Sequence, residues 1–303
     1  MNLLTQKSSA NYGGQALIEG VLIRGMHAIS VAVRRPNGSI FVTTENIGWK
    51  WAQRLRTIPM IRGTIVLAEM LTLGTKALML SAQVSIEEED TTEDTTLSSV
   101  AIGATLFTST ILSIGLFFIL PTVATNFIDS NYETTNITSN IIEGMFRLIL
   151  FITYLFVIGL SKDVRRIFEY HGAEHMTVHA YENGRELTIK NIRDYDTPHP
   201  RCGTAFLLVV LIIAIIVHVL WTPPILWERI LSRIILIPII TGISYEIIKW
   251  SSKYSSFTIM KLIIAPNLWL QSLTTKQPDD SQIEVAIHAM NGAIEADQLI
   301  NQR

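Results

Sequence analysis

The chain has 303 residues and a formal net charge of −2 at pH 7; 49% of its residues are apolar and 17% are charged. An average soluble protein carries about 25% charged residues, so this composition excludes a disordered chain and disfavours an ordinary soluble enzyme. The nearly neutral balance lacks the basic excess of a nucleic-acid-binding protein, so no nucleic-acid partner is expected. A single cysteine, Cys202, excludes an intramolecular disulfide.

Residues 1–58 are predicted to form a small, β-rich region in the cytosol. Residues 16–23 are largely apolar, residues 29–33 alternate in part, and residues 36–38 (Pro-Asn-Gly) are a hairpin turn signal before a return strand. A sheet of three strands is the simplest arrangement, and it would need helices or the membrane surface to cover it.

Residues 59–97 are predicted to form an amphipathic helix followed by an acidic linker. Within the helix the polar residues recur every seventh position, so they lie on one face and form a polar seam of Arg62, Glu69, Lys76 and Gln83. Such a helix suits the membrane interface. The seam faces either bulk water or a water-containing space between membrane spans. Six acids between residues 87 and 94 indicate a solvated linker.

Residues 98–250 are predicted to form a membrane domain with four spans. A bilayer-spanning helix needs about 20 mainly apolar residues. Four stretches approach that length, and they cover residues 100–120, 141–160, 203–221 and 225–250.

The orientation follows from the distribution of Lys and Arg. The loop over residues 121–140 has neither, whereas the loop over residues 161–202 has seven. The positive-inside rule then places the loop 161–202 and both termini in the cytoplasm, and the lipid bilayer is the expected partner.

Residues 251–303 are predicted to add an amphipathic helix over residues 257–273 and a cytosolic helix over residues 282–299. The predicted fold class is therefore an α+β integral membrane protein. It has about four transmembrane helices, a small cytosolic N-terminal sheet, interfacial amphipathic helices and a cytosolic C-terminal helix.

The motif with catalytic potential is His-x-x-Glu-His at His171, Glu174 and His175, within a predicted helix over residues 161–183. Residues four apart lie one turn apart on one helix face, so His171 and His175 can bind one metal ion. Glu174 can then act as a general base on water at that ion. The motif by itself is a weak signal, because two such histidines also occur by chance.

A second cluster strengthens the prediction. His199 and Cys202 lie at the cytoplasmic start of the third span, on the same side of the membrane as the first motif. His171, His175, His199 and Cys202 together would give one divalent ion, most fittingly Zn²⁺, four ligands. Four ligands are typical of a structural site, so catalysis requires either five-coordination or the displacement of one ligand, for which Cys202 is the candidate.

Glu246, near the cytoplasmic end of the fourth span, has three interpretations. It is a further metal ligand, a partner for Arg62 or Lys76, or a side chain that extends to the membrane surface.

The chain resembles the YqhQ-like bacterial membrane proteins, a family of unknown function. The resemblance lies in GGQALIEGVLIRG at residues 13–25, YHGAEH at 170–175, HPRCGT at 199–204, GISYE at 242–246, and the segment 266–286. It implies a bacterial inner-membrane protein and a predicted metal-dependent enzyme. It also implies that Glu19, Arg24 and Arg201 are motif positions. Met176 stands where the family usually has Lys; if that Lys serves a substrate anion, this member either differs in that respect or uses Arg201 instead.

Three functions remain open from the sequence. The first is a metal-dependent hydrolase at the cytoplasmic face of the membrane. The second is a non-enzymatic membrane scaffold or assembly factor with a structural metal, which would bind another membrane protein. The third is a small transporter that uses the seam of Arg62, Glu69 and Lys76 together with Glu246.

Overall fold

The structure is a computed structural model, and it describes residues 12–47, 55, 57–86, 99–132, 134–199, 202–221, 225–253 and 258–302. The acidic segment 87–94 and Arg201 lie outside these residues.

The N-terminal region is an antiparallel sheet in the order β1 (Gly13–Leu17), β2 (Gly20–Arg24), β3 (Ala28–Arg34) and β4 (Ile40–Asn46). The expected number of three strands is wrong, because a tight turn splits the apolar stretch 16–23 between β1 and β2. Glu19 occupies this turn with a φ of 50°, a left-handed conformation that reverses the chain within two residues. The sheet therefore has four strands.

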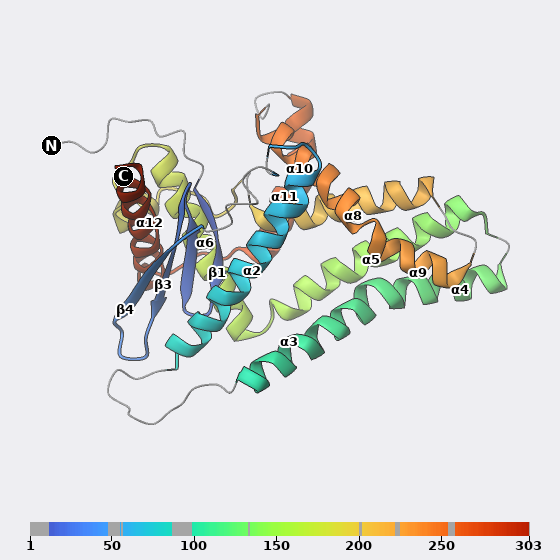
Figure 1. The fold of residues 1–303 in the computed structure, drawn as a ribbon, viewed down its shortest axis with the longest axis horizontal. Helices are drawn as coiled ribbons and strands as arrows, with labels where there is room; N and C mark the ends of the chain where they lie inside the picture. Colours follow the sequence, from blue (N-terminus) through green and yellow to red (C-terminus); the bar gives the residue numbers. More distant parts are fainter. Residues whose placement is uncertain are drawn as a thin grey trace.

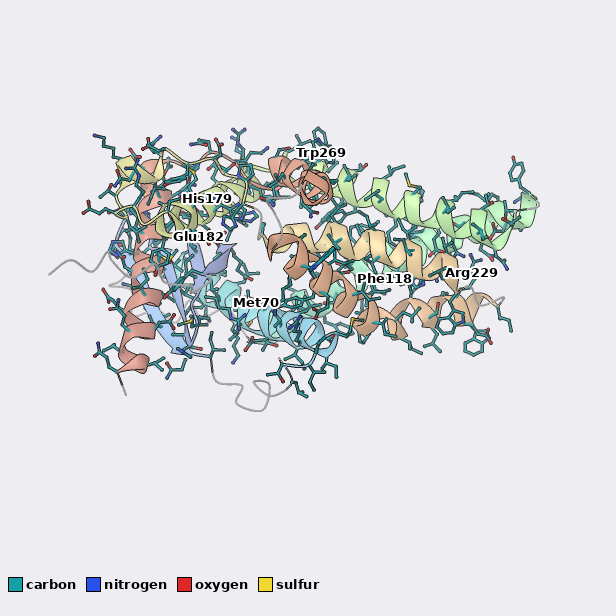
Figure 2. The ribbon with its side chains drawn as sticks, turned by 90° about the horizontal axis from the view of Figure 1, so that it is seen from above. Met70, Phe118, His179, Glu182, Arg229 and Trp269 are labelled. Atoms are coloured by element: carbon teal, nitrogen blue, oxygen red, sulfur yellow. The ribbon has the colours of Figure 1, made fainter. Side chains whose placement is uncertain are left out.

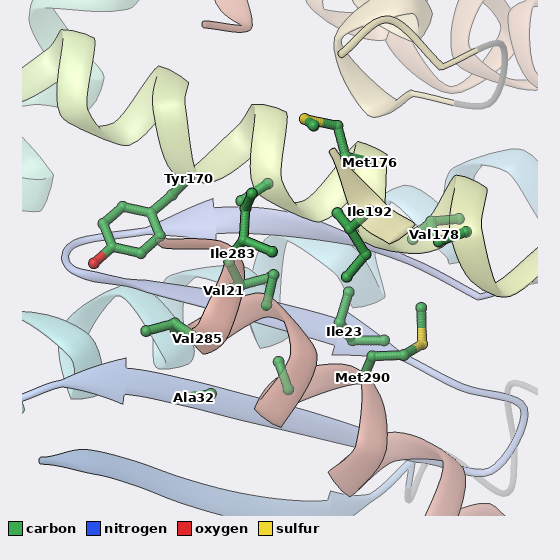
Figure 3. Packing of buried hydrophobic residues seen from close by; sticks show 14 of the residues in the cluster. Val21, Ile23, Ala32, Tyr170, Met176, Val178, Ile192, Ile283, Val285 and Met290 are labelled. Carbon is green, nitrogen blue, oxygen red and sulfur yellow. The ribbon is translucent and has the colours of Figure 1, made fainter. Parts of the chain in front are cut away.

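Helices cover both faces of the sheet. On one face, α6 (Lys162–Glu182) and α12 (Asp280–Asn301) pack on Val21 and Ile23 of β2 in a continuous core (Figure 3). On the other face, α2 (Ile61–Val84) packs on Leu22. Successive residues of a strand point to opposite faces, so one short strand contributes to both cores. The C-terminal helix predicted as a separate cytosolic element is thus part of the sheet's own unit.

The apolar helices form the other end of the molecule (Figure 1). These are α3 (Ser99–Ile114), the π-helical turn η1 (Gly115–Ile119), α4 (Leu120–Asn131), α5 (Asn136–Ile158), α8 (Gly203–Leu220), α9 (Leu226–Ile235) and α10 (Ile237–Lys253). The short α7 (Ile189–Ile192) follows α6, and α11 (Thr258–Thr274) precedes α12.

Among the described residues, three helices are long and apolar enough to cross a membrane, and the number rises to four if a bent pair counts as one span. The three are Ile61–Val84, Gly103–Asn131 and Asn136–Ile158. The apolar helix Phe206–Leu220 is shorter. The chain is therefore mostly helical, with several helices compatible with a membrane protein.

Two predicted spans differ from the helices observed. The first does not end near residue 120 but continues to Asn131, because Pro121 lies in the first turn of α4, where a missing N–H costs little. The fourth is not one straight helix. It breaks into α9 and α10 with a bend of 44°, and Pro238 follows the break. Proline lacks the amide that would continue the helix, which explains the bend.

The helix α2 contacts both ends of the molecule. Its C-terminal half packs on the sheet through Leu73, Ala77 and Val84. Near its start, Gly63 lies so close to Tyr245 of α10 that a Cβ there would come within 2.6 Å of that side chain. The predicted helix after residue 59 is confirmed, and it links the sheet to the apolar helices.

Candidate metal centre

The helix α6 presents the His-x-x-Glu-His motif to the interior. All residues from Tyr170 to Val178 are buried. Gly172 permits this close packing, since a Cβ there would lie 2.1 Å from the carbonyl oxygen of Lys276. His171 and His175 lie on the same face of α6, and their ring centroids are 4.4 Å apart.

Cys202 lies beside this face, just before α8. The ligand atoms of His171, His175 and Cys202 all lie within 4.8 Å of one another, and all three side chains are buried. The His171 Nε2 is 3.2 Å from the Cys202 Sγ. Zinc bonds of about 2.0 Å to nitrogen and 2.3 Å to sulfur give a separation of roughly 3.5 Å in a tetrahedron, which is close to the separation of this pair.

Backbone carbonyls orient both imidazoles. The Nδ1 of His171 lies 2.9 Å from the carbonyl oxygen of Thr274, and the Nδ1 of His175 lies 2.6 Å from that of Thr197. A carbonyl only accepts, so each Nδ1 carries the proton and each Nε2 keeps its lone pair. This is the arrangement that metal-binding histidines adopt.

Glu174 lines a cavity next to these ligands. The cavity has a volume of about 20 Å³, enough for about one water, and its lining also includes Gly13, Gly14, His175, His199 and Cys202. Burial raises the pKa of Glu174 to about 7, while His171 and a hydrogen bond from the Gly14 N–H oppose the rise. A carboxyl with a pKa near the working pH can both accept and return a proton.

His199 does not converge with the other three ligands. Its Nε2 lies 3.4 Å from a carboxylate oxygen of Glu182, and its backbone N–H donates to Gln271 at 2.8 Å. Burial lowers the pKa of His199 to about 4 and that of His175 well below its ordinary value. Both imidazoles are therefore neutral at pH 7. The contact of 3.4 Å between His175 and Glu174 is not an ion pair, because the histidine carries no charge.

The seam residues lie in different environments. Arg62 donates to Glu246, with its Nε 2.7 Å from Oε1, so of the three interpretations of Glu246 the structure has the pairing with Arg62. Glu69 is fully buried and receives a hydrogen bond from Arg24 at 2.8 Å. Lys76 is exposed. The seven-residue spacing correctly indicated one helix. The three charged side chains on that helix face differ in burial, because Arg62 is half-buried, Glu69 is buried and Lys76 is exposed.

The other motif positions link elements of the sheet unit. The Glu19 carboxylate in the β1–β2 turn accepts from Arg166 Nη2 at 2.6 Å and from the Tyr170 hydroxyl at 3.1 Å, and both donors are on α6. Arg24 joins β2 to Glu69 of α2. These contacts hold the sheet against its two helices, away from the three ligand atoms.

Sequence reasoning missed the groups that support the ligands. The carbonyls of Thr197 and Thr274 have no signal in the sequence, because any residue supplies a carbonyl. Tyr12, Gly13 and Gly14 line the cavity. Only Gly13 and Gly14 had a signal, since the adjacent pair in a strand marks a close backbone approach.

Comparisons with known proteins agree over most of the chain. Residues 58–296 match the family described as "Protein of unknown function (DUF1385)". The chain is similar to the "Uncharacterized protein YqhQ" of Bacillus subtilis (strain 168), with 33% identity over 304 aligned residues, 96% of this chain and 94% of that protein. No solved structure matches the chain. Neither description names an activity, so the expectation of a metal-dependent enzyme gains no support from them. The chain belongs to the DUF1385 family.

Proposed function

We propose that the protein is a multi-pass protein of the bacterial cytoplasmic membrane that acts as a metal-dependent hydrolase at the cytoplasmic face. The observation that carries this proposal is the convergence of three ligand atoms, from His171, His175 and Cys202, beside a cavity lined by the buried carboxyl of Glu174.

The course of the chain supports four crossings, namely α3–α4, α5, α8 and the bent pair α9–α10. The helix α6 follows α5 and packs on the sheet, and α12 follows α10 and α11 and packs on the same sheet. The chain therefore returns to the sheet after each pair of crossings, so the number of membrane crossings must be even. The α2 helix fits the interfacial position, because its C-terminal half is covered by the sheet.

The distribution of Lys and Arg places the sheet end in the cytoplasm. A phosphatase that is active only outside the cytoplasm, fused at Thr134 or at the C-terminus, tests this orientation. We expect activity from the fusion at Thr134 and none from the C-terminal fusion. The reverse result would contradict the orientation.

The donor set fits Zn²⁺, because two imidazoles and a thiolate are ligands that this ion prefers. Three protein ligands leave a tetrahedral ion one open position, which is typical of catalytic sites. A bound ion would supply Lewis acidity, which lowers the pKa of a water molecule and polarises a carbonyl.

The residues of the chain would then divide the work. His171 and His175 present their Nε2 atoms because Thr274 and Thr197 hold their Nδ1 protons. Glu174 lines the same cavity and would accept a proton from a water there, then return it to the leaving group. The buried surroundings of Glu174 keep bulk water away from the site.

Metal content tests the site. The protein is purified in detergent without a His-rich tag, and Zn, Fe, Mn and Ni are quantified per chain. We expect about one ion in the parent, none in His171→Ala, and retention in the matched control His199→Ala, which removes a nearby imidazole outside the three-ligand set. A folded parent without metal would refute the proposal.

A second measurement separates catalysis from structure. The protein is loaded with Co²⁺, whose absorption spectrum reports its coordination, and acetohydroxamate is added. An open position predicts a spectral change on hydroxamate binding, in the parent and in Glu174→Gln alike. An unchanged spectrum, together with metal loss in His199→Ala, would favour the membrane scaffold with a structural metal.

The transporter remains the third candidate and has the least support. Arg62 and Glu69, two of its seam residues, each form an ion pair with a neighbouring element. Such pairs are typical of helix packing.

A further inference from the structure

A second buried polar cluster lies at the opposite end of the molecule from the candidate metal centre. Figure 2 shows Arg229 at this end, far from His179 and Glu182. Its centre is Glu143 of α5, which is 1% exposed. The Glu143 carboxylate accepts from Arg147 Nη2 at 2.8 Å and from Arg233 Nη2 at 2.9 Å.

Arg229 completes the cluster from α9. Its Nη2 donates to the Ser139 hydroxyl at 2.8 Å, and its Nη1 lies 3.4 Å from an Asp129 carboxylate oxygen. The Glu143 carboxylate is 3.8 Å away from Arg229. Three arginines therefore share two carboxylates among the described side chains of this cluster. All three arginines are at least nine-tenths buried.

Three guanidinium groups and two carboxylates leave one positive charge without a counter-charge within the cluster. A guanidinium stays protonated at every physiological pH, so proton loss cannot remove the excess. An uncompensated charge away from water is costly, whereas a bound monoanion would neutralise it.

A spare donor points to the same kind of ligand. The Arg229 Nε is buried and has no hydrogen-bond acceptor among the described atoms, although both terminal nitrogens of the same guanidinium are engaged. A planar guanidinium with a free N–H matches the oxygens of a phosphate group particularly well.

The position of α9 suits a ligand from the membrane surface. Its Arg229 and Arg233 face inward, whereas Trp227, Leu231 and Ile234 are exposed on the opposite side. The helix is bent by 44° from the helix that follows it. An amphipathic helix with an exposed Trp is typical of the interface where lipid headgroups lie.

We propose that Arg147, Arg229 and Arg233 form a binding site for a singly charged phosphate group at the end of the membrane domain distant from the sheet. A phosphodiester carries one negative charge, which equals the excess of the cluster. The same chemistry is available from an anionic phospholipid headgroup or from free phosphate. This proposal is independent of the metal centre.

The test measures ligand-dependent thermal stability of the full chain in non-ionic detergent. The probes are dioctanoyl phosphatidylglycerol, its zwitterionic counterpart dioctanoyl phosphatidylcholine, and inorganic phosphate. We expect phosphatidylglycerol to bind the parent at least about tenfold more tightly than phosphatidylcholine. If inorganic phosphate binds and displaces phosphatidylglycerol, the natural ligand of the site is a free oxyanion. If it does not, the natural ligand is the headgroup of a lipid.

A charge series isolates the cluster. Arg229→Gln removes the excess charge and should weaken the binding of phosphatidylglycerol by at least about tenfold. Arg229→Lys keeps the charge and should retain most of the affinity for phosphatidylglycerol. Asp129→Asn raises the excess to two charges and should tighten binding. The matched control Arg62→Gln removes an arginine at the other end of the apolar helices and should leave the affinity unchanged.

Equal affinity of the parent for the two lipids would overturn the proposal. Unchanged affinity in Arg229→Gln would do the same. If Arg229→Gln does not fold, Asp129→Asn tests the proposal instead. The Asp129 carboxylate is partly exposed, so its loss is easier to tolerate. A failure of Asp129→Asn to bind phosphatidylglycerol more tightly than the parent would then refute a site governed by excess charge.

Discussion

Four imidazoles lie close together, three on α6 and one beside it, and hydrogen bonds divide them into two kinds. His171 and His175 use Nδ1 to reach backbone carbonyls, and their Nε2 atoms lie 3.2 Å from the Cys202 Sγ and 3.4 Å from a Glu174 carboxylate oxygen, respectively. His179 and His199 use Nε2 itself, toward the Pro198 carbonyl and the Glu182 carboxylate. The candidate metal ligands therefore differ from their neighbours in that their Nε2 atoms face Cys202 and Glu174.

A single carboxylate holds the turn between β2 and β3. Asp297 of α12 accepts from the backbone N–H groups of Met26 and His27, both at 2.8 Å, from that of Ala28 at 3.1 Å and from the Tyr12 hydroxyl at 3.0 Å. Asp297 is 3% exposed. Removing it would leave several donors without an acceptor.

We expect Asp297→Ala to lower the free energy of unfolding by about 3 kcal/mol or more, because four donors lose a buried, charged acceptor. Asp194→Ala is the matched control, since Asp194 forms an exposed ion pair with Arg185 worth less than about 1 kcal/mol. Thermal or denaturant unfolding in detergent measures both. Equal losses in the two variants would contradict the role assigned to Asp297.

At the scale of elements, α12 begins with a complete capping box. The Asp279 carboxylate accepts from the Gln282 N–H at 2.9 Å, and the Gln282 side chain accepts from the Asp279 N–H at 2.9 Å. Burial raises the pKa of Asp279, but hydrogen bonds from Ser281 and Gln282 outweigh it and hold the pKa below its ordinary value. The cap is thus strongest when Asp279 is ionised.

We expect Asp279→Ala to cost about 1 kcal/mol of stability at pH 7. A depressed folded pKa contributes stability above the unfolded value, so this contribution is lost as the pH falls below 3.8 toward the folded pKa. Unfolding measured at pH 7 and at pH 3 should show the difference between parent and variant shrink at the lower pH. A difference that stays constant would contradict the cap.

The helix α2 depends on a buried ion pair with the sheet. Glu69 is fully buried, and Arg24 of β2 donates to it. A buried charge that loses its partner is costly, whereas removing both charges costs much less.

We therefore expect Arg24→Leu to destabilise the protein by about 3 kcal/mol or more, and the double variant Arg24→Leu/Glu69→Leu to recover much of that loss. A thermodynamic cycle of the two single variants and the double variant measures the coupling. Additive losses would show that the pair does not fasten α2 to the sheet.

At the scale of the whole molecule, the candidate metal centre joins two regions. His171 and His175 belong to α6 in the core with the sheet, whereas Cys202 lies just before α8, one of the apolar helices. A bound ion would therefore fasten the sheet unit to the apolar helices.

We expect a chelator to lower the Tm of the metal-loaded parent by about 5 °C or more, since a ligand that binds only the folded state stabilises it. The variant His171→Ala should show no such change. A thermal shift assay with EDTA and re-addition of Zn²⁺ measures the effect, and an equal decrease in the variant would point to a site elsewhere.

Local sequence patterns predicted those elements whose formation depends on the residues of the element itself. The four apolar stretches, the helix that carries His171 and His175, and the C-terminal helix followed from hydrophobicity, spacing and cap residues. The predicted number of strands and the predicted straight fourth span were wrong, because each depends on the backbone conformation at a few residues. The turn at Glu19 and the break before Pro238 each depend on one or two residues.

Residue type and spacing alone were enough to predict that several helices are apolar enough for a membrane and that two histidines share one helix face. The packing of the helices was needed to learn that Cys202 reaches these histidines while His199 turns toward Glu182. It also decided that three arginines from two helices surround Glu143. These contacts join residues far apart in the chain, and their geometry depends on how the helices pack.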